Sequence, residues 1–455
     1  MPDILSMKTL RTAVQNGSVD TVIAAFPDMQ GRLMGKRFHA QFFIDHAWEK
    51  THCCNYLIAT DLEMATVDGF ASTSWSSGYG DYVMRPDLGT LCMLPWLDAT
   101  ALVLCDLLDH HTHELVPHAP RTILKQQLKR AADRGLTMMA ATELEFFVFR
   151  ETFETIRDAD YHVMTPISAY NEDYHIFQTT KEESLMRQIR NGLYGAGITV
   201  ENTKGEADAG QAEINVHYAD ALRMGDVHVM VKNAVKEIAF LNDRAVTFLA
   251  KWHHHAAGSS SHIHQSLRSA EGNAMFFDPA QPHGMSQMMQ SYLAGLLTYA
   301  DDTTYFLAPY VNSYKRFMAG TFAPTKAIWS IDNRTAGYRV VAENSQNIRV
   351  ECRVGGSDLN PYLALAGQLA AGLKGIEDHL TLEAEFSGDA YQADAARAIL
   401  ASLREATLAL DGSDMLRAAM GDAVIDHYVR AARWEQEDFD SKVTDYEVCR
   451  GFERA

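Results

Sequence analysis

Hydrophobic and polar positions change their period several times along the chain. Residues 5–17 repeat apolar side chains at helical spacing, whereas 20–27 and 31–39 alternate like two strands around a turn. Short apolar runs separated by glycine-rich turns continue from 52 to 110. The pattern therefore predicts a small unit at the N-terminus that is rich in β-strands.

The pattern changes after residues 118–120, where an amphipathic helix begins that should end at Gly135. Strands and helices then alternate to the end of the chain. We predict strands at 143–149, 212–218 and 347–354, and a long apolar helix at 360–380. Because 455 residues are too many for one compact core, we expect two domains that meet near residue 115.

Three short segments with strand character carry polar side chains two positions apart, and such side chains share one face of a strand about 7 Å apart. The pairs are Glu143 with Glu145, His262 with His264, and Glu351 with Arg353. A glycine-containing segment adds Glu206 and Glu213. Carboxylates and imidazoles around a cavity hold hard divalent cations, and this mixture suits Mg²⁺ or Mn²⁺. From spacing alone, polar decoration of exposed strand faces remains the alternative.

Arginines are concentrated in one part of this acidic chain: Arg316, Arg334, Arg339, Arg349 and Arg353. The forked guanidinium group binds carboxylate or phosphate through two hydrogen bonds, although these arginines could also simply balance surface acids. The chain lacks the G-x-x-x-x-G-K-[ST] and G-x-G-x-x-G motifs of nucleotide-binding loops. If the protein uses a nucleotide, its side chains and metal ions must hold the phosphates.

Composition and charge limit the partners. The chain is 47% hydrophobic and 22% charged, which is typical of globular proteins. Its formal net charge of −19 argues against nucleic acid or an anionic membrane as a partner. The sequence contains no signal-peptide pattern, no run of about 18 apolar residues and no C-x-x-C pair. We therefore expect a cytoplasmic protein.

Five motifs resemble those of glutamine synthetases and occur in the same order: TELEFFVF, GEADAGQAE, GSSSHIHQSL, NSYKR and IRVECR, the last followed by NPYLALA. The resemblance spans essentially the whole chain. It implies an α+β fold, with a β-grasp N-terminal domain over 1–115 and a larger α/β catalytic domain, built on a curved antiparallel sheet, over 116–455. It also implies a homo-oligomer, commonly a dodecamer, with each active site between neighbouring subunits.

The resemblance also implies roles for individual residues, with ATP as cosubstrate and two or three Mg²⁺ or Mn²⁺ ions. The metal ion nearer glutamate would be bound by Glu145, Glu206 and Glu213. The metal ion that bridges the ATP phosphates would be bound by Glu143, His262 and Glu351. Contacts to ATP would come from His264, Ser266, Arg334, Arg339 and Arg349. The glutamate substrate would be held by Glu145, Gly258, Arg316 and Arg353, and the catalytic set would be Arg316, Arg334, Arg353 and Asp68.

The acceptor end departs from the family pattern. Glutamine synthetases carry a Glu six residues after the Arg of S-Y-K-R, where it binds ammonium and takes its proton. Phe322 occupies that position here. A phenyl ring packs against alkyl groups and attracts an ammonium head through its face, but it accepts no proton. Asp68 is the counterpart of a second family carboxylate, and Phe322 belongs to the expected substrate-binding residues.

The sequence therefore predicts an ATP-dependent carbon–nitrogen ligase that forms a γ-glutamylamide from glutamate and an organic amine through γ-glutamyl phosphate. A true glutamine synthetase that uses ammonia, with Asp68 as the proton acceptor, is the first alternative. A non-enzymatic relative is the second, and the presence of all six metal-ligand candidates argues against it.

Overall fold

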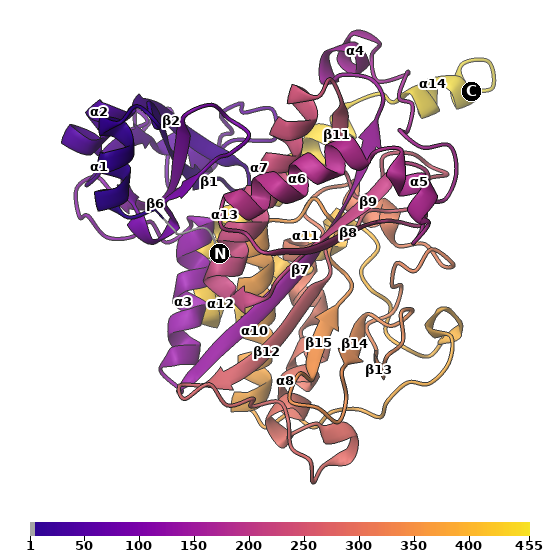
Figure 1. Cartoon of the computed structure of the whole chain (residues 1–455). Helices are drawn as coiled ribbons and strands as arrows, with labels where there is room; N and C mark the ends of the chain where they lie inside the picture. The colour runs from indigo at the N-terminus through magenta and orange to yellow at the C-terminus, as the bar shows by residue number, and fades with distance from the viewer. Residues whose placement is uncertain (1–4) are drawn as a thin grey trace.

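The N-terminal part of the chain forms a six-stranded sheet, shown in indigo in Figure 1; the computed structural model describes residues 5–455. Ser6 caps helix α1 (Met7–Gln15), where its hydroxyl accepts the backbone N–H of Thr9. The predicted hairpin is confirmed, because β1 (Thr21–Pro27) pairs antiparallel with β2 (Leu33–His39). The order β2-β1-β6-β4-β3 is completed by β3 (Thr51–Cys54), β4 (Asp81–Pro86) and β6 (Thr100–Asp109), with β5 (Cys92–Met93) beside β6.

The second sheet has nine strands and carries most of the candidate residues. Its path is β13-β14-β15-β12-β7-β9-β8, and β10 and β11 also pair with β7. The longest strand, β7 (Leu136–Phe149), starts seven residues before the predicted strand because its alternating burial begins at Leu136. The other strands are β8 (Val200–Gly205), β9 (Gln211–Val216), β10 (Ala219–Asp220), β11 (Ala245–Thr247), β12 (Ile263–Ser269), β13 (Trp329–Ile331), β14 (Tyr338–Val341) and β15 (Arg349–Cys352).

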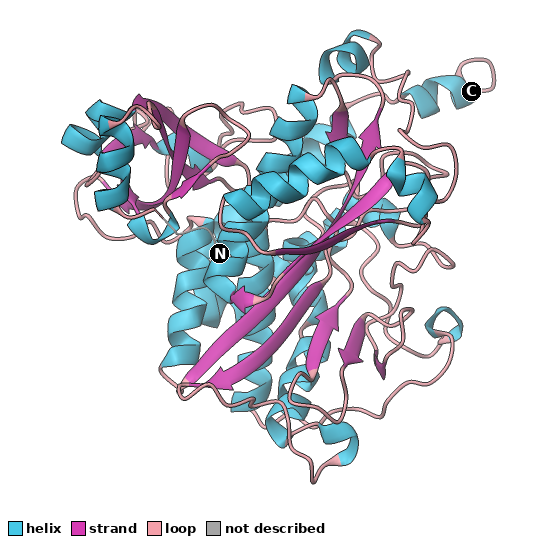
Figure 2. Ribbon diagram, viewed as in Figure 1, coloured by secondary structure: helices cyan, strands magenta, loops and turns pink. Residues whose placement is uncertain are grey.

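Helices cover one face of the large sheet, as Figure 2 shows. The long apolar helix predicted at 360–380 is α10 (Pro361–Glu377), and almost all of its side chains are buried. It crosses α8 (Gln287–Thr298) so closely that a Cβ on Gly375 would lie 2.2 Å from the carbonyl oxygen of Ser291. The remaining helices are α2 (Ala40–Phe42), α3 (Pro120–Ala132), α4 (Phe153–Asp158), α5 (Ile176–Thr180), α6 (Glu183–Gly195), α7 (Ala221–Leu241), α9 (Ala300–Leu307), α11 (Leu403–Asp411), α12 (Asp414–Met420), α13 (Asp422–Ser441) and α14 (Asp445–Gly451).

The two sheets share one continuous hydrophobic core, which runs from Leu10 to Ala432. A buried charge network also joins them. The Arg121 guanidinium on α3 donates hydrogen bonds to Asp106 on β6, to Asp226 on α7 and to Asp87. The small sheet is therefore anchored to the helical layer by both apolar packing and paired charges.

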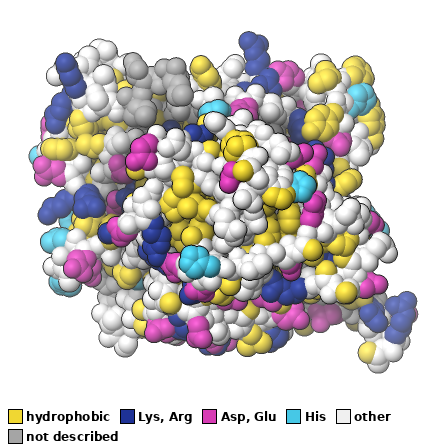
Figure 3. Space-filling view, turned by 90° about the horizontal axis from the view of Figure 1, so that it is seen from below, with side chains coloured by type: hydrophobic (Ala, Val, Ile, Leu, Met, Phe, Trp, Pro, Cys, Tyr) yellow, Lys and Arg dark blue, Asp and Glu magenta, His cyan; other side chains and the backbone are white. Residues whose placement is uncertain are grey.

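The fold is α+β, as predicted, with a small sheet followed by a larger mixed sheet and its helices. On the face shown in Figure 3, acidic and basic side chains are interspersed with apolar ones. Within residues 5–455, we find no helix with the length and apolar character that crossing a bilayer would require.

Candidate active site

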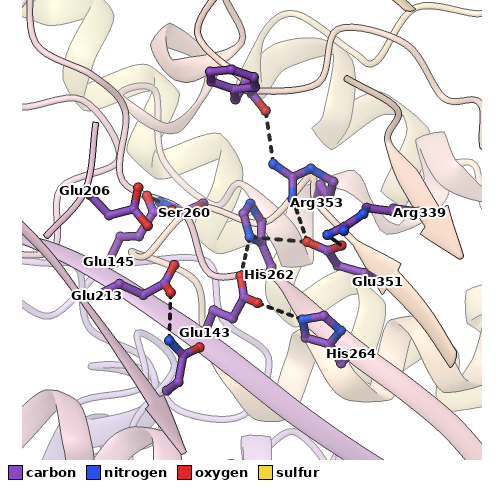
Figure 4. Close-up of polar contacts among 12 residues, drawn as sticks. Glu143, Glu145, Glu206, Glu213, Ser260, His262, His264, Arg339, Glu351 and Arg353 are labelled. Atoms are coloured by element: carbon purple, nitrogen blue, oxygen red, sulfur yellow. Dashed lines mark hydrogen bonds and ion pairs between the residues drawn. The ribbon is translucent and has the colours of Figure 1, made fainter. Parts of the chain in front are cut away.

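The polar pairs predicted from the sequence lie on neighbouring strands of the large sheet. In the antiparallel register of the sheet, His264 on β12 lies opposite Glu351 on β15, and Glu145 on β7 lies opposite Glu213 on β9. Directly opposed residues point to the same face, so the pairs converge there. His262 lies just before β12 and Arg353 just after β15. Figure 4 shows the converging side chains.

The first carboxylate cluster consists of Glu145, Glu206 and Glu213, whose oxygens lie within 4.8 Å of one another. Ser260 donates its backbone N–H and its hydroxyl to Glu145, at 2.7 and 2.6 Å. Burial, with the charge of Glu206 adding to it, raises the pKa of Glu145. Burial and the charge of Glu143 likewise raise the pKa of Glu213. The negative charges of these crowded carboxylates are not fully neutralised by neighbouring groups. A hard divalent cation would neutralise them, so the three residues fit such an ion.

Lys204 is a member of this cluster that the sequence analysis missed. It lies opposite Glu213 on β8, and its ammonium group forms an ion pair with Glu206. The same nitrogen lies 3.8 Å from a Glu213 oxygen and 3.9 Å from Asp173. Burial lowers the pKa of Lys204, but Glu213 and Glu206 outweigh it and raise that pKa above its ordinary value. The available sequence signal was its position two residues before Glu206 on one strand face.

The second cluster is centred on Glu143. His262 Nδ1 lies 2.6 Å from one Glu143 oxygen and 3.5 Å from Glu351, while His264 Nε2 lies 2.9 Å from the other Glu143 oxygen. The ligand atoms of Glu143, His264 and Glu351 lie within 4.8 Å of one another. The sequence analysis placed His262, and not His264, in this metal-binding set, so the structure adds His264 as a candidate ligand. Burial raises the pKa of Glu143, but hydrogen bonds from both rings outweigh it and lower that pKa.

His262 has the chemistry that a metal ligand needs. Burial, with the charge of Arg353 adding to it, lowers the pKa of His262 and so favours its neutral form. A neutral imidazole has a lone pair to bind a metal ion. Two carboxylates and two imidazoles thus fit Mg²⁺ or Mn²⁺, with Mn²⁺ the more tolerant of nitrogen ligands.

Two arginines contact this second cluster directly. Arg353 donates to Glu351 at 2.6 Å, and Arg339 donates to the other oxygen of Glu351 at 3.0 Å. Burial raises the pKa of Glu351, but the charge of Arg353 and that of His262 outweigh it and lower that pKa. Within the described part of the chain, the buried Nε of Arg353 has no hydrogen-bond partner. That free donor is suited to an anionic ligand.

The other three predicted arginines lie around the same space. Arg316 is buried and donates to the carbonyl oxygens of Val354 and Arg353, each at 2.9 Å. Arg349 donates to His264 Nδ1 at 3.2 Å, and Arg334 lies exposed on the cavity wall. Position 258 has no room for a side chain, because a Cβ there would lie 2.5 Å from Cγ of Arg316.

Two cavities that share wall residues contain these groups. The larger, of about 730 Å³, is lined by both carboxylate clusters and by Arg316, Arg334, Arg339 and Arg353. The smaller, of about 350 Å³, shares Glu143 with it and is lined by His264, Ser266, Arg349 and apolar side chains such as Phe276 and Ile348. The sequence-predicted residues therefore separate into a highly charged compartment and a partly apolar one.

The two residues predicted for the acceptor end lie in different places. Phe322 lines the larger cavity and the residue is 57% exposed, and its carbonyl oxygen accepts a hydrogen bond from Arg353 at 3.4 Å. Its φ of +57° is strained for a bulky residue. Asp68 is exposed elsewhere, where its carbonyl oxygen accepts a bond from Arg430, and it lines neither cavity. Within one chain, the structure therefore does not bring Asp68 to the site.

Two clusters of potential metal ligands and five arginines lie around the two cavities. This arrangement suits an enzyme that brings anionic reactants together, as ligases do. The particular family follows from the sequence match. The chain belongs to the glutamine synthetase family, because residues 117–451 match the model described as "Glutamine synthetase, catalytic domain".

Relatives extend the similarity over almost the whole chain. γ-Glutamylethanolamide synthetase GlnA4 of Streptomyces coelicolor is 47% identical over 99% of this chain and 96% of its own length. Glutamate–isopropylamine ligase of a Pseudomonas species is 33% identical over 97% of this chain and 96% of its own length. A solved structure titled as a GmaS/ADP complex superimposes with a TM-score of 0.84 at 26% identity, covering 99% of this chain and all of that one.

Proposed function

We propose that this protein is an ATP-dependent ligase that joins the side-chain carboxyl of glutamate to an organic amine, giving a γ-glutamylamide. One observation carries the proposal: Phe322 lines the charged cavity at the position of the family's ammonium-binding Glu, while both carboxylate clusters and the arginines are present. A phenyl ring favours an alkyl-bearing amine over ammonium. The names of the two relatives support an organic acceptor, because one names a γ-glutamylethanolamide as product and the other names isopropylamine as the amine that is joined to glutamate.

In the first half-reaction, a glutamate carboxylate oxygen bonds to the γ-phosphorus of ATP, and the bond from that phosphorus to the bridging oxygen breaks. ADP leaves, and γ-glutamyl phosphate remains. Glu143, His262 and Glu351, and separately Glu145, Glu206 and Glu213, would hold divalent ions. When bound, such ions would supply positive charge that offsets the repulsion between the two anions. Arg353, with its unpartnered Nε, and Arg316 would hold the carboxylate and the transferred phosphoryl group.

Nucleotide binding is proposed for the smaller cavity. The apolar walls of this cavity suit a purine ring. Arg349 and His264 lie where the cavity meets the candidate metal ligands around Glu143. Arg334 and Arg339 line the charged side and would contact phosphate. The ADP in the similar GmaS structure supports a nucleotide for this chain as well.

In the second half-reaction, the amine nitrogen bonds to the γ-carbonyl carbon, the carbon–oxygen bond to phosphate breaks, and the nitrogen loses a proton. Phe322 would pack against the amine's alkyl group. The exposed Asp68 is proposed as the proton acceptor for the site of a neighbouring subunit, since it does not reach the site of its own chain. The same proposal includes a cytoplasmic homododecamer with active sites between subunits, and the particle mass in solution checks that assembly.

A panel of acceptors tests the function. Phosphate release would be measured with glutamate, ATP, Mg²⁺ or Mn²⁺ and, in turn, ammonia, methylamine, ethanolamine, isopropylamine and putrescine, with product masses confirming the amide. We expect at least one organic amine to exceed ammonia in kcat/KM. If ammonia exceeds every amine, the chain is a true glutamine synthetase and the proposal is wrong.

A substitution at the acceptor end provides the second test. Phe322→Glu should raise the ammonia-to-amine ratio of kcat/KM by about tenfold or more, because it restores a carboxylate that binds ammonium and takes its proton. Phe322→Leu is the matched control, since it keeps an apolar wall and should leave ammonia a poor acceptor. An unchanged ratio in Phe322→Glu would remove the proposed role from this residue.

A further inference from the structure

Lys204 introduces a positive charge from the chain itself into the cluster proposed to bind the glutamate-side cation. Its ammonium group is ion-paired with Glu206 and lies 3.8 Å from an oxygen of Glu213, and its side chain is 19% exposed. Glu206 and Glu213 are two of the three carboxylates whose oxygens lie within 4.8 Å of one another. One oxygen of the proposed cation site is therefore already occupied by an internal cation.

An ammonium and a divalent ion cannot both contact the same carboxylate oxygen without strong mutual repulsion, because like charges a few ångströms apart in a partly buried site are poorly screened. We propose that Lys204 is an internal counter-ion of the Glu145–Glu206–Glu213 cluster, which a divalent ion must displace when it binds. The inference rests on the proposed function in one respect, namely that a divalent ion occupies this cluster. It adds that the chain itself weakens the affinity of that site.

The surroundings of Lys204 give the displaced ammonium a second partner. Asp173 lies 3.9 Å from Nζ, and the ring of Tyr174 has its centre 4.8 Å away. Both residues line the same cavity. Lysine reaches alternative partners easily, because its compact charge sits on a flexible four-carbon stem. Exchange between Glu206 and Asp173 would thus keep the ammonium paired, whether or not the cation is bound.

A purely structural ion pair would make a different prediction. If Lys204 only stabilised the fold, its removal would lower stability and leave cation affinity unchanged or weaker. If Lys204 competes with the cation, its removal must strengthen cation binding while it destabilises the metal-free protein. The two readouts move in opposite directions only under competition.

The experiment titrates MnCl₂ into the full-length, metal-stripped protein without nucleotide, by calorimetry and by the electron paramagnetic resonance signal of free Mn²⁺. The variants are Lys204→Met, which keeps the stem and removes the charge, and Lys204→Arg, which keeps the charge. Lys129→Met is the matched control, because Lys129 is 74% exposed and forms a salt bridge on the outer face of α3. Melting temperatures in EDTA and in Mn²⁺ complete the set.

We expect one class of Mn²⁺ sites to bind about tenfold or more tightly in Lys204→Met than in the unmodified protein, since one nearby positive charge is gone. Lys204→Arg and Lys129→Met should stay within about twofold of the unmodified protein. In EDTA the melting temperature of Lys204→Met should fall, and Mn²⁺ should restore it. Equal or weaker Mn²⁺ binding in a folded Lys204→Met overturns the inference. Absence of Mn²⁺ binding in both proteins overturns the proposed cation site along with it, and the amine panel reports on the acceptor separately.

Discussion

Replacement of Arg121 by Met tests how the small sheet is held to the rest of the molecule. Arg121 is 3% exposed and donates to both oxygens of Asp226, each at 3.0 Å, to Asp106 at 2.6 Å and to Asp87 at 2.7 Å. Methionine fills most of the apolar volume of the stem and supplies none of these donors. The substitution therefore isolates the charge and hydrogen-bonding contribution from the packing contribution.

The expected cost depends on the partners that remain. Asp106 keeps the Lys125 ammonium at 2.6 Å, and Asp87 is one-third exposed and can be solvated. Asp226 is 3% exposed and would keep the hydroxyl of Tyr362 at 2.8 Å but no cation at hydrogen-bond distance. Breaking a buried ion pair from one side costs about 3–5 kcal/mol. We expect Arg121→Met to lower the free energy of unfolding by that amount.

Urea denaturation at a fixed protein concentration, followed by tryptophan fluorescence and circular dichroism, measures the change. The double variant Arg121→Met with Asp226→Asn should recover about half of the loss or more, because no uncompensated carboxylate is left buried. Arg404→Met is the control, since Arg404 and Asp440 form a solvent-exposed pair whose loss should leave the free energy of unfolding nearly unchanged. A loss below about 1 kcal/mol for Arg121→Met, or no recovery in the double variant, would refute the reasoning.

Two further predictions concern the site and the pH dependence of stability. Gly258→Ala would place a Cβ 2.5 Å from Cγ of Arg316, so kcat/KM for glutamate should fall about tenfold to a hundredfold, whereas Gly80→Ala, with its nearest contact at 3.8 Å, should leave it unchanged. Equal activity of the two variants would contradict this account. Burial, with the charge of Glu172 adding to it, raises the pKa of Glu182 to about 8, so the folded chain holds a proton that the unfolded chain releases. Stability from this group is full below its ordinary pKa of 4.5 and is lost as pH rises through about 8. The melting temperature should therefore fall between about pH 5 and 8, and Glu182→Gln should flatten that fall; an unchanged slope would show that other groups dominate.

Much of the fold follows from local pattern. The hairpin of β1 and β2, the helix that begins at Pro120 and the strand that carries Glu143 and Glu145 are predictable, because alternation and helical spacing are local properties. The parallel pairing of β1 with β6 could not be predicted this way, since it joins residues that lie far apart in the sequence. The domain boundary near residue 115 stays a prediction, and the hydrophobic core continues across it.

In the candidate site, too, local spacing predicted some features, whereas others depend on how distant segments pack together. Spacing identifies which side chains share a strand face, and the register then brings Glu145 to Glu213 and His264 to Glu351. Spacing does not reveal which of two histidines lies closer to a given carboxylate, so the role of His264 beside Glu143 emerged from geometry. Lys204 was missed because a lysine two residues from a glutamate usually forms an exposed ion pair, and only the fold places this one, partly buried, among three carboxylates.

Under the proposed function, the two half-reactions need different kinds of chemistry, and the residues that sequence reasoning predicted best would serve the first. Phosphoryl transfer needs several charges in fixed positions, and eleven of the residues that line the cavity are Glu, His or Arg, many of them paired with one another. Acceptor choice needs a wall of the right shape, and that wall depends on Phe322 in a strained loop. A substitution in the wall can therefore change the acceptor without disturbing the charge network, whereas a change in a paired charge disturbs several partners together. This difference explains why an amine-specific ligase can keep the complete metal and arginine framework of a glutamine synthetase.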